Sequence, residues 1–138
     1  MTDPQRKYLI DVSEAIQHIE SFIEIAPGLE EYKSNLLVRR AVERELEIIG
    51  EAINQLLHTD SPPDILNASR IVDMRNRVIH GYDTVDDAII WGILQRYIPE
   101  LKEQVYAVIG INPSFQPRQP TALRKLHLLD HLSPGRSR

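Results

Sequence analysis

Hydrophobic residues return every three or four positions through most of the chain, which is the spacing that places them along one face of an α-helix. The first such stretch follows Asp3 and Pro4, residue types that favour a helix start, and it stops at the pair Pro27-Gly28. It predicts one amphipathic helix, whose apolar face consists of Leu9, Val12, Ile16, Ile19 and Ile23.

A short acidic linker precedes a second predicted helix, for which Ser34 or Asn35 is a suitable N-cap. This helix should extend to about His58. Gly50 lies in its interior, where glycine costs roughly 1 kcal/mol relative to alanine, so we expect a neighbouring helix to approach closely there. The buried face of the second helix is predicted to consist of Val38, Val42, Leu46, Ile49, Ile53 and Leu56.

A third helix is predicted to open within residues 61–64, where a capping serine precedes two prolines and a carboxylate. It should end near His80, because Gly81 readily adopts the left-handed conformation that terminates helices. Its inward-facing residues are predicted to be Ile65, Ile71, Met74 and Val78.

A fourth helix should start at Thr84, which has the spacing of a capping box with Asp87. Pro99 lies inside its apolar pattern and should kink or split the helix, because proline has no backbone N–H to donate. The predicted buried face consists of Ile90, Leu94, Tyr97, Leu101, Val105 and Val108. Four long helices joined by short links indicate an all-α protein, an antiparallel up-and-down four-helix bundle.

Length and charge divide the chain into two parts. Its 138 residues suffice for one domain with a core, which we assign to residues 1–110. Residues 111–138 are predicted to form a basic, proline-containing tail that is flexible or weakly helical. The tail carries five Arg or Lys and one Asp, a net +4, so the total of −4 leaves −8 on the body. Because nucleic-acid binding depends on neutralising phosphates, any nucleic-acid site on this acidic body must be local or assembled between subunits.

Residue types that are missing exclude several kinds of chemistry. The chain contains no cysteine, so disulfides, thiolate zinc sites and a cysteine nucleophile are excluded. No stretch approaches the ~20 apolar residues that span a bilayer, and no secretory signal is recognisable. We therefore expect a cytoplasmic protein without membrane association. His127 and His131 have the spacing of a metal pair but lack a third ligand, so neither a metal nor a cofactor is predicted.

The segment 71–83, IVDMRNRVIHGYD, concentrates residues suited to phosphate chemistry. Imidazole exchanges protons near neutral pH, so His80 could deprotonate a ribose 2′-hydroxyl or protonate the leaving 5′-oxygen. Arg75, which is always charged, could hold the phosphate and stabilise the transition state. The two residues lie on different faces of an ideal helix, but a long arginine can reach a ligand at the helix end. Asn76 lies on the same ridge as His80 and could orient its ring.

This arrangement resembles a known family. The run Arg75-(four residues)-His80-x-Tyr82 is similar to the R-x4-H-x-Y signature of HEPN ribonucleases in the HepT-like toxin family. The segment LEIIGEAINQL, which contains Glu51, resembles the corresponding helix of that family, and YIPEL resembles a segment of its last helix. The resemblance covers roughly residues 5–109 and leaves the tail outside.

The resemblance implies a function and two partners. It implies a homodimeric, HEPN-like bundle in which two copies of the motif meet at a positively charged cleft and cut RNA. It further implies the toxin of a toxin–antitoxin pair, whose antitoxin is a small nucleotidyltransferase of the MntA type. In some members this antitoxin transfers AMP to the motif tyrosine, Tyr82 here. AMP two residues from His80 would add bulk and negative charge where the substrate phosphate should bind.

Other interpretations of the same residues remain open. A helical dimer with a basic cleft could bind a nucleotide, or hold the substrate of a nucleotidyltransferase, without cutting RNA. It could also be a purely structural interaction module. Glu43, Glu47 and Glu51 form a like-charged ladder on the second helix, which is either a solvated face answered by nearby arginines or a device in which Glu51 orients an active-site group.

Overall fold

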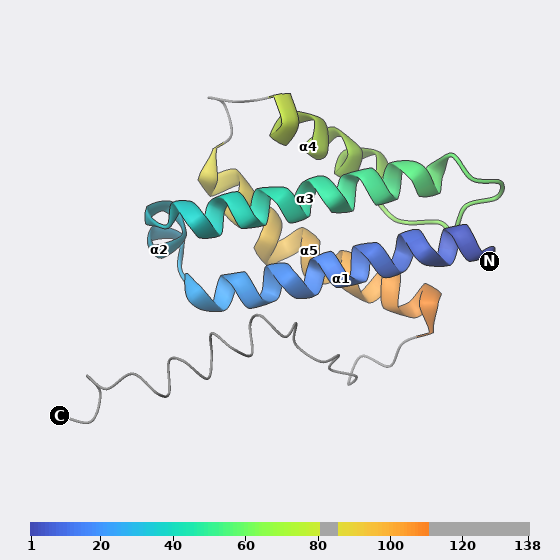
Figure 1. The fold of residues 1–138 in the computed structure, drawn as a ribbon, viewed down its shortest axis with the longest axis horizontal. Helices are drawn as coiled ribbons and strands as arrows, with labels where there is room; N and C mark the ends of the chain where they lie inside the picture. The colour runs from blue at the N-terminus through green and yellow to red at the C-terminus, as the bar shows by residue number, and fades with distance from the viewer. Residues whose placement is uncertain (81–85, 111–138) are drawn as a thin grey trace.

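The computed structural model describes residues 1–80 and 86–110, and every regular element in these ranges is an α-helix. In chain order the helices are α1 (Asp3–Ile25), α2 (Leu29–Ser34), α3 (Leu36–Leu57), α4 (Ala68–His80) and α5 (Asp87–Ile109). The four longer helices alternate in direction (Figure 1). The predicted all-α antiparallel bundle is therefore confirmed, with one short helix that the pattern did not predict. The tail predicted at 111–138 lies outside the described residues.

Helices α1 and α3 pack along each other and form the centre of the bundle, with α4 packed on α3 and α5 packed on α1 and α2 (Figure 1). The predicted apolar faces of α1 and α3 are buried, apart from Ile23, which is only partly covered. Each fully buried aliphatic side chain contributes about 1.5–3 kcal/mol relative to its exposed state. On α1 and α3, the aliphatic side chains with no solvent exposure are Leu9, Val12, Ile16, Ile19, Val42, Leu46, Ile49, Ile53 and Leu56.

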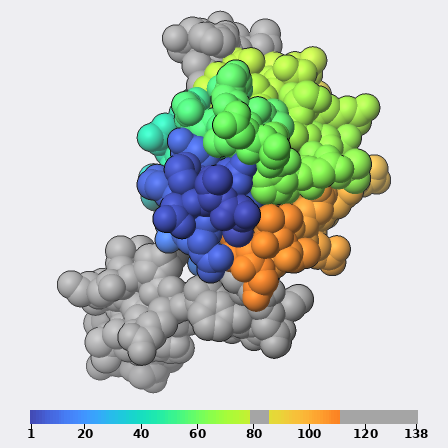
Figure 2. All heavy atoms as spheres, turned by 90° about the vertical axis from the view of Figure 1, so that its right-hand side faces the viewer, coloured from blue at the N-terminus to red at the C-terminus, as the bar shows by residue number. Residues whose placement is uncertain are grey.

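The start of α1 is fixed by a capping box. The Thr2 side chain accepts from the backbone N–H of Gln5, whose side-chain oxygen accepts from the backbone N–H of Thr2. The Gln5 amide nitrogen donates to Thr59 Oγ1 (3.0 Å) and to the carbonyl oxygen of Asp60 (2.9 Å). This buried amide therefore ties the first turn of α1 to the connection after α3, at the end of the bundle that Figure 2 presents.

The predicted acidic linker contains the helix α2, which is a correction to the sequence-based expectation. Six residues span less than two turns, so no apolar periodicity could indicate it. Its Tyr32 is completely buried and packs on Trp91 of α5, with 5.5 Å between ring centroids. Asn35, one of the two predicted caps, accepts from Val38 N and opens α3.

Helix α4 starts at Ala68, so the start predicted within residues 61–64 is wrong. A residue that precedes proline avoids the helical region, and two successive prolines therefore keep this segment extended or turned. Ser61 and Asn67 have positive φ angles of 47° and 62°, which mark turns before the helix. Ile65 and Ile71 are buried as predicted, whereas Met74 and Val78 are only partly buried.

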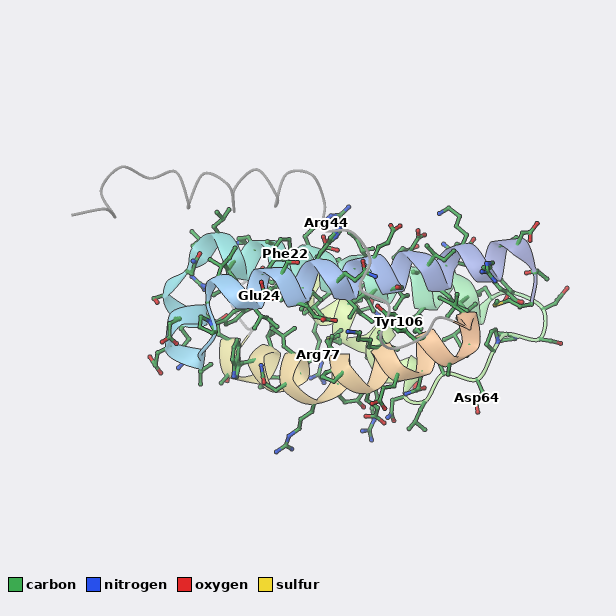
Figure 3. The ribbon with its side chains drawn as sticks, turned by 90° about the horizontal axis from the view of Figure 1, so that it is seen from below. Phe22, Glu24, Arg44, Asp64, Arg77 and Tyr106 are labelled. Atoms are coloured by element: carbon green, nitrogen blue, oxygen red, sulfur yellow. The ribbon has the colours of Figure 1, made fainter. Side chains whose placement is uncertain are left out.

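Helix α5 is capped by Asp86, whose carboxylate accepts from Ala88 N, rather than by Thr84, which lies outside the described residues. Pro99 lies inside α5 and does not split it, contrary to one of the two predicted outcomes. The buried residues of α5 are Ile90, Leu94, Ile98, Leu101, Val105, Tyr106 and Ile109. The predicted Tyr97 and Val108 are only partly buried. Tyr106 instead faces α1, where its hydroxyl accepts from Gln17 Nε2 at 3.3 Å (Figure 3).

Candidate active site

Helix α4 carries the motif at its C-terminal half. Arg75 and Asn76 lie on this helix, and His80 is its last residue. The structure describes the backbone of His80 and not its side chain, and Tyr82 lies outside the described residues. Contacts within residues 1–80 and 86–110 therefore define the surroundings of Arg75, which is one part of the candidate site.

Gly50 of α3 lies directly beneath Arg75. A Cβ atom built at Gly50 would be 2.2 Å from Arg75 Cβ and 2.8 Å from Arg75 Cγ, distances that real atoms do not occupy. The aliphatic stem of Arg75 therefore lies across α3 where no side chain intervenes. The close helix approach expected at Gly50 is confirmed. It determines where along α3 the Arg75 side chain reaches the surface of the bundle.

Glu51, the next residue on α3, forms an ion pair with Arg75 through Nη1. The side chain of Arg75 is 21% exposed and that of Glu51 is 51% exposed, so the pair lies at the surface with the arginine better covered. The Glu51 carboxylate also accepts from Gln55 Nε2 at 3.0 Å. Glu51 therefore contacts Arg75 across the bundle, and its predicted role in orienting an active-site group stays a prediction.

The other two glutamates of the ladder are paired within α3. Arg40 contacts Glu43 at 2.9 Å and Arg44 contacts Glu47 at 3.2 Å, both at i,i+3 spacing. Both arginines are largely exposed, and pairs of this kind contribute only a few tenths of a kcal/mol. These four residues therefore form the solvated face that the alternative interpretation described.

Asn76 is engaged by Arg75 as well. The Asn76 side-chain oxygen accepts from Arg75 Nε at 3.2 Å and from Nη2 at 2.8 Å. The sequence had suggested a bond from Asn76 to the His80 ring, and that ring lies outside the described side chains. Glu51 and Asn76 together hold the guanidinium in one orientation, which is the requirement for a residue that must meet a phosphate at a fixed place.

A groove of about 860 Å³ runs beside the motif, between α4 and α5. In the described residues these two helices make little direct contact, and the apolar side chains between them include the exposed Ile89 and the partly buried Met74, Val78, Ile93 and Tyr97. The floor and walls include Ile49, Ile71, Met74, Val78, Ile89, Ile90, Ile93, Tyr97, Ile98 and Leu101. Arg70, Asp73, Asn76, Asp86 and Arg77, the last labelled in Figure 3, complete the lining. No sequence pattern indicates this groove, because the same apolar spacing would occur in a closed core.

Two further observations concern ligands and membranes. Within the described ranges, no cluster of three or more His, Asp or Glu side chains is arranged to hold a metal ion. No helix in the same ranges combines the length and the apolar character needed to cross a membrane.

An all-helical bundle that presents an arginine and, five residues later, a histidine at the end of one helix has the features of a HEPN-type nuclease. Residues 12–108 match the family described as Ribonuclease HepT-like, which covers more than half of the chain and the entire motif. The chain therefore belongs to the HepT-like ribonuclease family, and the resemblance drawn from the motif is confirmed.

Individual relatives agree with this assignment. A protein of Thermococcus cleftensis named as a probable ribonuclease HepT is 35% identical over 109 residues, covering 74% of this chain and 93% of the relative. A candidate RNase of Caldanaerobacter subterraneus subsp. tengcongensis is 34% identical, covering 68% and 87%. A candidate RNase of Methanocaldococcus jannaschii is 30% identical, covering 75% and 94%. No solved structure matches the chain significantly.

Proposed function

We propose that this protein is a metal-independent endoribonuclease, the toxin of a toxin–antitoxin pair, and that it cuts RNA by transesterification at a site shared across a homodimer. His80 acts as general acid or base, and Arg75 binds the phosphate and stabilises the negative charge of the transition state. The observation that carries the proposal is the family match, which includes the whole motif on the helix where Arg75 is already held in place.

The contacts of Arg75 suit this role. A guanidinium has five N–H donors, and three donor contacts in the structure go to Glu51 and Asn76. Among the described residues no contact uses the other two N–H groups, so a substrate phosphate could bind them without displacing the residues that orient the arginine. Glu51 is half exposed, and solvent therefore screens its charge and limits its repulsion of the phosphate.

The groove between α4 and α5 is the face that we assign to a second copy. An apolar groove with incompletely covered side chains is typical of a protein interface, and among its lining residues Ile89 is 60% exposed while Ile93 and Tyr97 are partly buried. A two-fold interface must be complementary to itself. The charged residues of the groove meet this condition, because Arg70 and Arg77 are matched in number by Asp73 and Asp86. A second copy seated here would bring two motifs to one cleft.

The toxin role and the control by an antitoxin are supported by the resemblance. A nucleotidyltransferase of the MntA type would silence the enzyme by transferring AMP to Tyr82. The added phosphate and nucleoside would occupy the space that an RNA phosphate needs beside His80. Mass spectrometry of the protein co-expressed with such a partner should find AMP on the peptide that contains Tyr82, and AMP on other peptides alone would contradict this assignment.

The experiment that tests the nuclease is an RNA cleavage assay in EDTA. Wild-type protein should produce 2′,3′-cyclic phosphate ends. His80→Ala should reduce the rate by about 100-fold or more, the usual contribution of a general acid or base. His58→Ala, at the exposed end of α3, is the matched control and should keep the wild-type rate. Absence of cleavage by the wild type, or equal rates for all three proteins, would contradict the proposal and favour a protein that only binds nucleotides.

A further inference from the structure

A second arginine–carboxylate pair joins α3 to the start of α5. Arg39 Nη1 donates to Asp87 Oδ2 at 3.3 Å, and the two side chains are 24% and 21% exposed. Asp87 is the first residue of α5 and follows its N-cap, Asp86. The two partners are 48 positions apart in the chain, so the contact fixes a tertiary arrangement rather than a helix turn.

The pair lies in a corner that α2 closes. Tyr32 of α2 is completely buried there and packs on Trp91, which is one turn after Asp87 on α5. The Tyr32 hydroxyl and Arg39 Nε are buried without a hydrogen-bond partner among the described residues. Burial raises the pKa of Tyr32 above its ordinary value, and the carboxylates of Glu43 and Asp87 raise it further. Arg39 is therefore more shielded from solvent than Arg40, which is 63% exposed in the neighbouring pair with Glu43.

One arginine pair holds the first residue of the motif, and the other lies at the start of the helix that follows the motif. Arg75 of α4 is tied to Glu51 of α3, and Asp87 of α5 is tied to Arg39 of α3. Arg39 and Glu51 are twelve positions apart, about 18 Å along the helix. Helix α4 packs on α3, whereas α5 packs mainly on α1 and α2 and makes little direct contact with α4, so the Arg39–Asp87 pair ties the start of α5 to the helix that supports α4. Six residues, 81–86, connect the two helices, and so short a connection depends on where its two ends are held.

We propose that Arg39 is a positioning residue for the nuclease, because its pair with Asp87 fixes the first turn of α5 directly after the motif. This inference rests on the proposed function. In this role Arg39 touches neither substrate nor reacting atoms. It acts by holding the first turn of α5, where the chain returns to the bundle after the motif. Loss of the pair should therefore disturb the start of α5 and slow the chemical step, while the rest of the bundle stays folded.

The test compares Arg39→Met and Asp87→Asn with Arg40→Met, which removes an exposed pair from the neighbouring position. Hydrogen–deuterium exchange of amides 86–91 should accelerate by about tenfold in the first two variants and stay unchanged in the control. Trp91, the single tryptophan, should report the same difference as a red-shifted emission. Exchange that rises equally in α1 and α3 would mean general destabilisation and would overturn the proposal.

Kinetics then separate positioning from stability. On RNA, Arg39→Met should lower kcat by about tenfold with KM within about twofold, whereas Arg40→Met should match the wild type. The double variant Arg39→Met/Asp87→Asn should be no slower than either single variant, because the two residues act as one unit. Wild-type kcat in Arg39→Met would overturn the positioning role even if exchange increased. Absence of cleavage by the wild type would instead overturn the proposed function. The positioning role would then fail with it, whatever the exchange and emission data show.

Discussion

The two sides of α4 differ in how they meet their neighbours. Toward α3 the contact is closed, because Gly50 has no side chain and Arg75 lies across it with its guanidinium tied to Glu51. Toward α5 the contact is open, and a groove of about 860 Å³ lies between apolar side chains that do not meet. One side of the motif helix is therefore completed within the chain, and the other is completed, in our proposal, by a second copy.

This difference shows how a small bundle can separate stability from function. On the closed side, Gly50 allows the close contact that fixes Arg75, although a glycine in the middle of a helix lowers its stability. The open side leaves Ile89 exposed and Ile93 and Tyr97 only partly covered, which makes this apolar surface available for association. Substitutions on the two sides should therefore change different properties of the protein.

The largest effect is expected on the open side. Ile89→Asp places a charge where the second copy should pack, so the dimer dissociation constant should rise by about 100-fold or more. RNA cleavage at low protein concentration should fall in proportion, with little change in the melting of the monomer. Leu37→Asp is the control, because Leu37 is 80% exposed and does not line the groove. Sedimentation equilibrium measures the outcome, and an unchanged dimer in Ile89→Asp would place the interface elsewhere.

A smaller effect is expected on the closed side. Gly50→Ala introduces a Cβ that overlaps Arg75, and urea unfolding should show a loss of about 2 kcal/mol even though alanine is the better helix former. Gly92→Ala on α5 makes the comparison, because no described atom lies within 4 Å of the added Cβ. That variant should gain up to about 1 kcal/mol. Equal effects of the two substitutions would show that α3 and α4 are not closely packed at Gly50.

The smallest effect concerns the hydroxyl of Tyr32, on the closed corner between α2, α3 and α5. It has no described partner, so Tyr32→Phe should raise the free energy of unfolding by about 1 kcal/mol at pH 7. Burial raises the pKa of Tyr32, so the unfolded chain loses this proton first, and the wild type should lose stability as pH rises above about 10. The advantage of the variant should therefore grow between pH 9 and pH 11. An advantage that stays constant over this range would contradict the burial of the phenol.

Much of the fold could be predicted because burial follows the helical period. The apolar faces of α1 and α3, the Asn35 cap and the close approach at Gly50 all depend on local spacing, which the sequence contains directly. The predicted start of α4 was wrong because a serine followed by prolines occurs both at helix starts and in turns. Helix α2 could not be predicted, since six residues contain too little of a period.

The candidate site was predictable where its residues are neighbours in the chain. Arg75, Asn76 and His80 lie on one helix as the spacing indicated, and their roles stay predictions. The contact of Glu51 with Arg75 was one of two open alternatives, because charge spacing alone does not say which partner lies across the bundle. Arg39 was one of the nearby arginines that could answer the glutamate ladder, and nothing local signals its contact with Asp87.

The most direct test of the shared site uses the absence of cysteine from the chain. Single cysteines placed in turn at Ile89, Ile93 and Tyr97 of the groove should be oxidised in EDTA, with Leu37→Cys as the reference. We expect at least one groove cysteine to form a covalent dimer much faster than the reference does. This covalent dimer should cut RNA at a dilution where the reduced protein does not. Groove cysteines that link no faster than Leu37→Cys, or RNA cleavage that is equally fast in the isolated monomer, would contradict it.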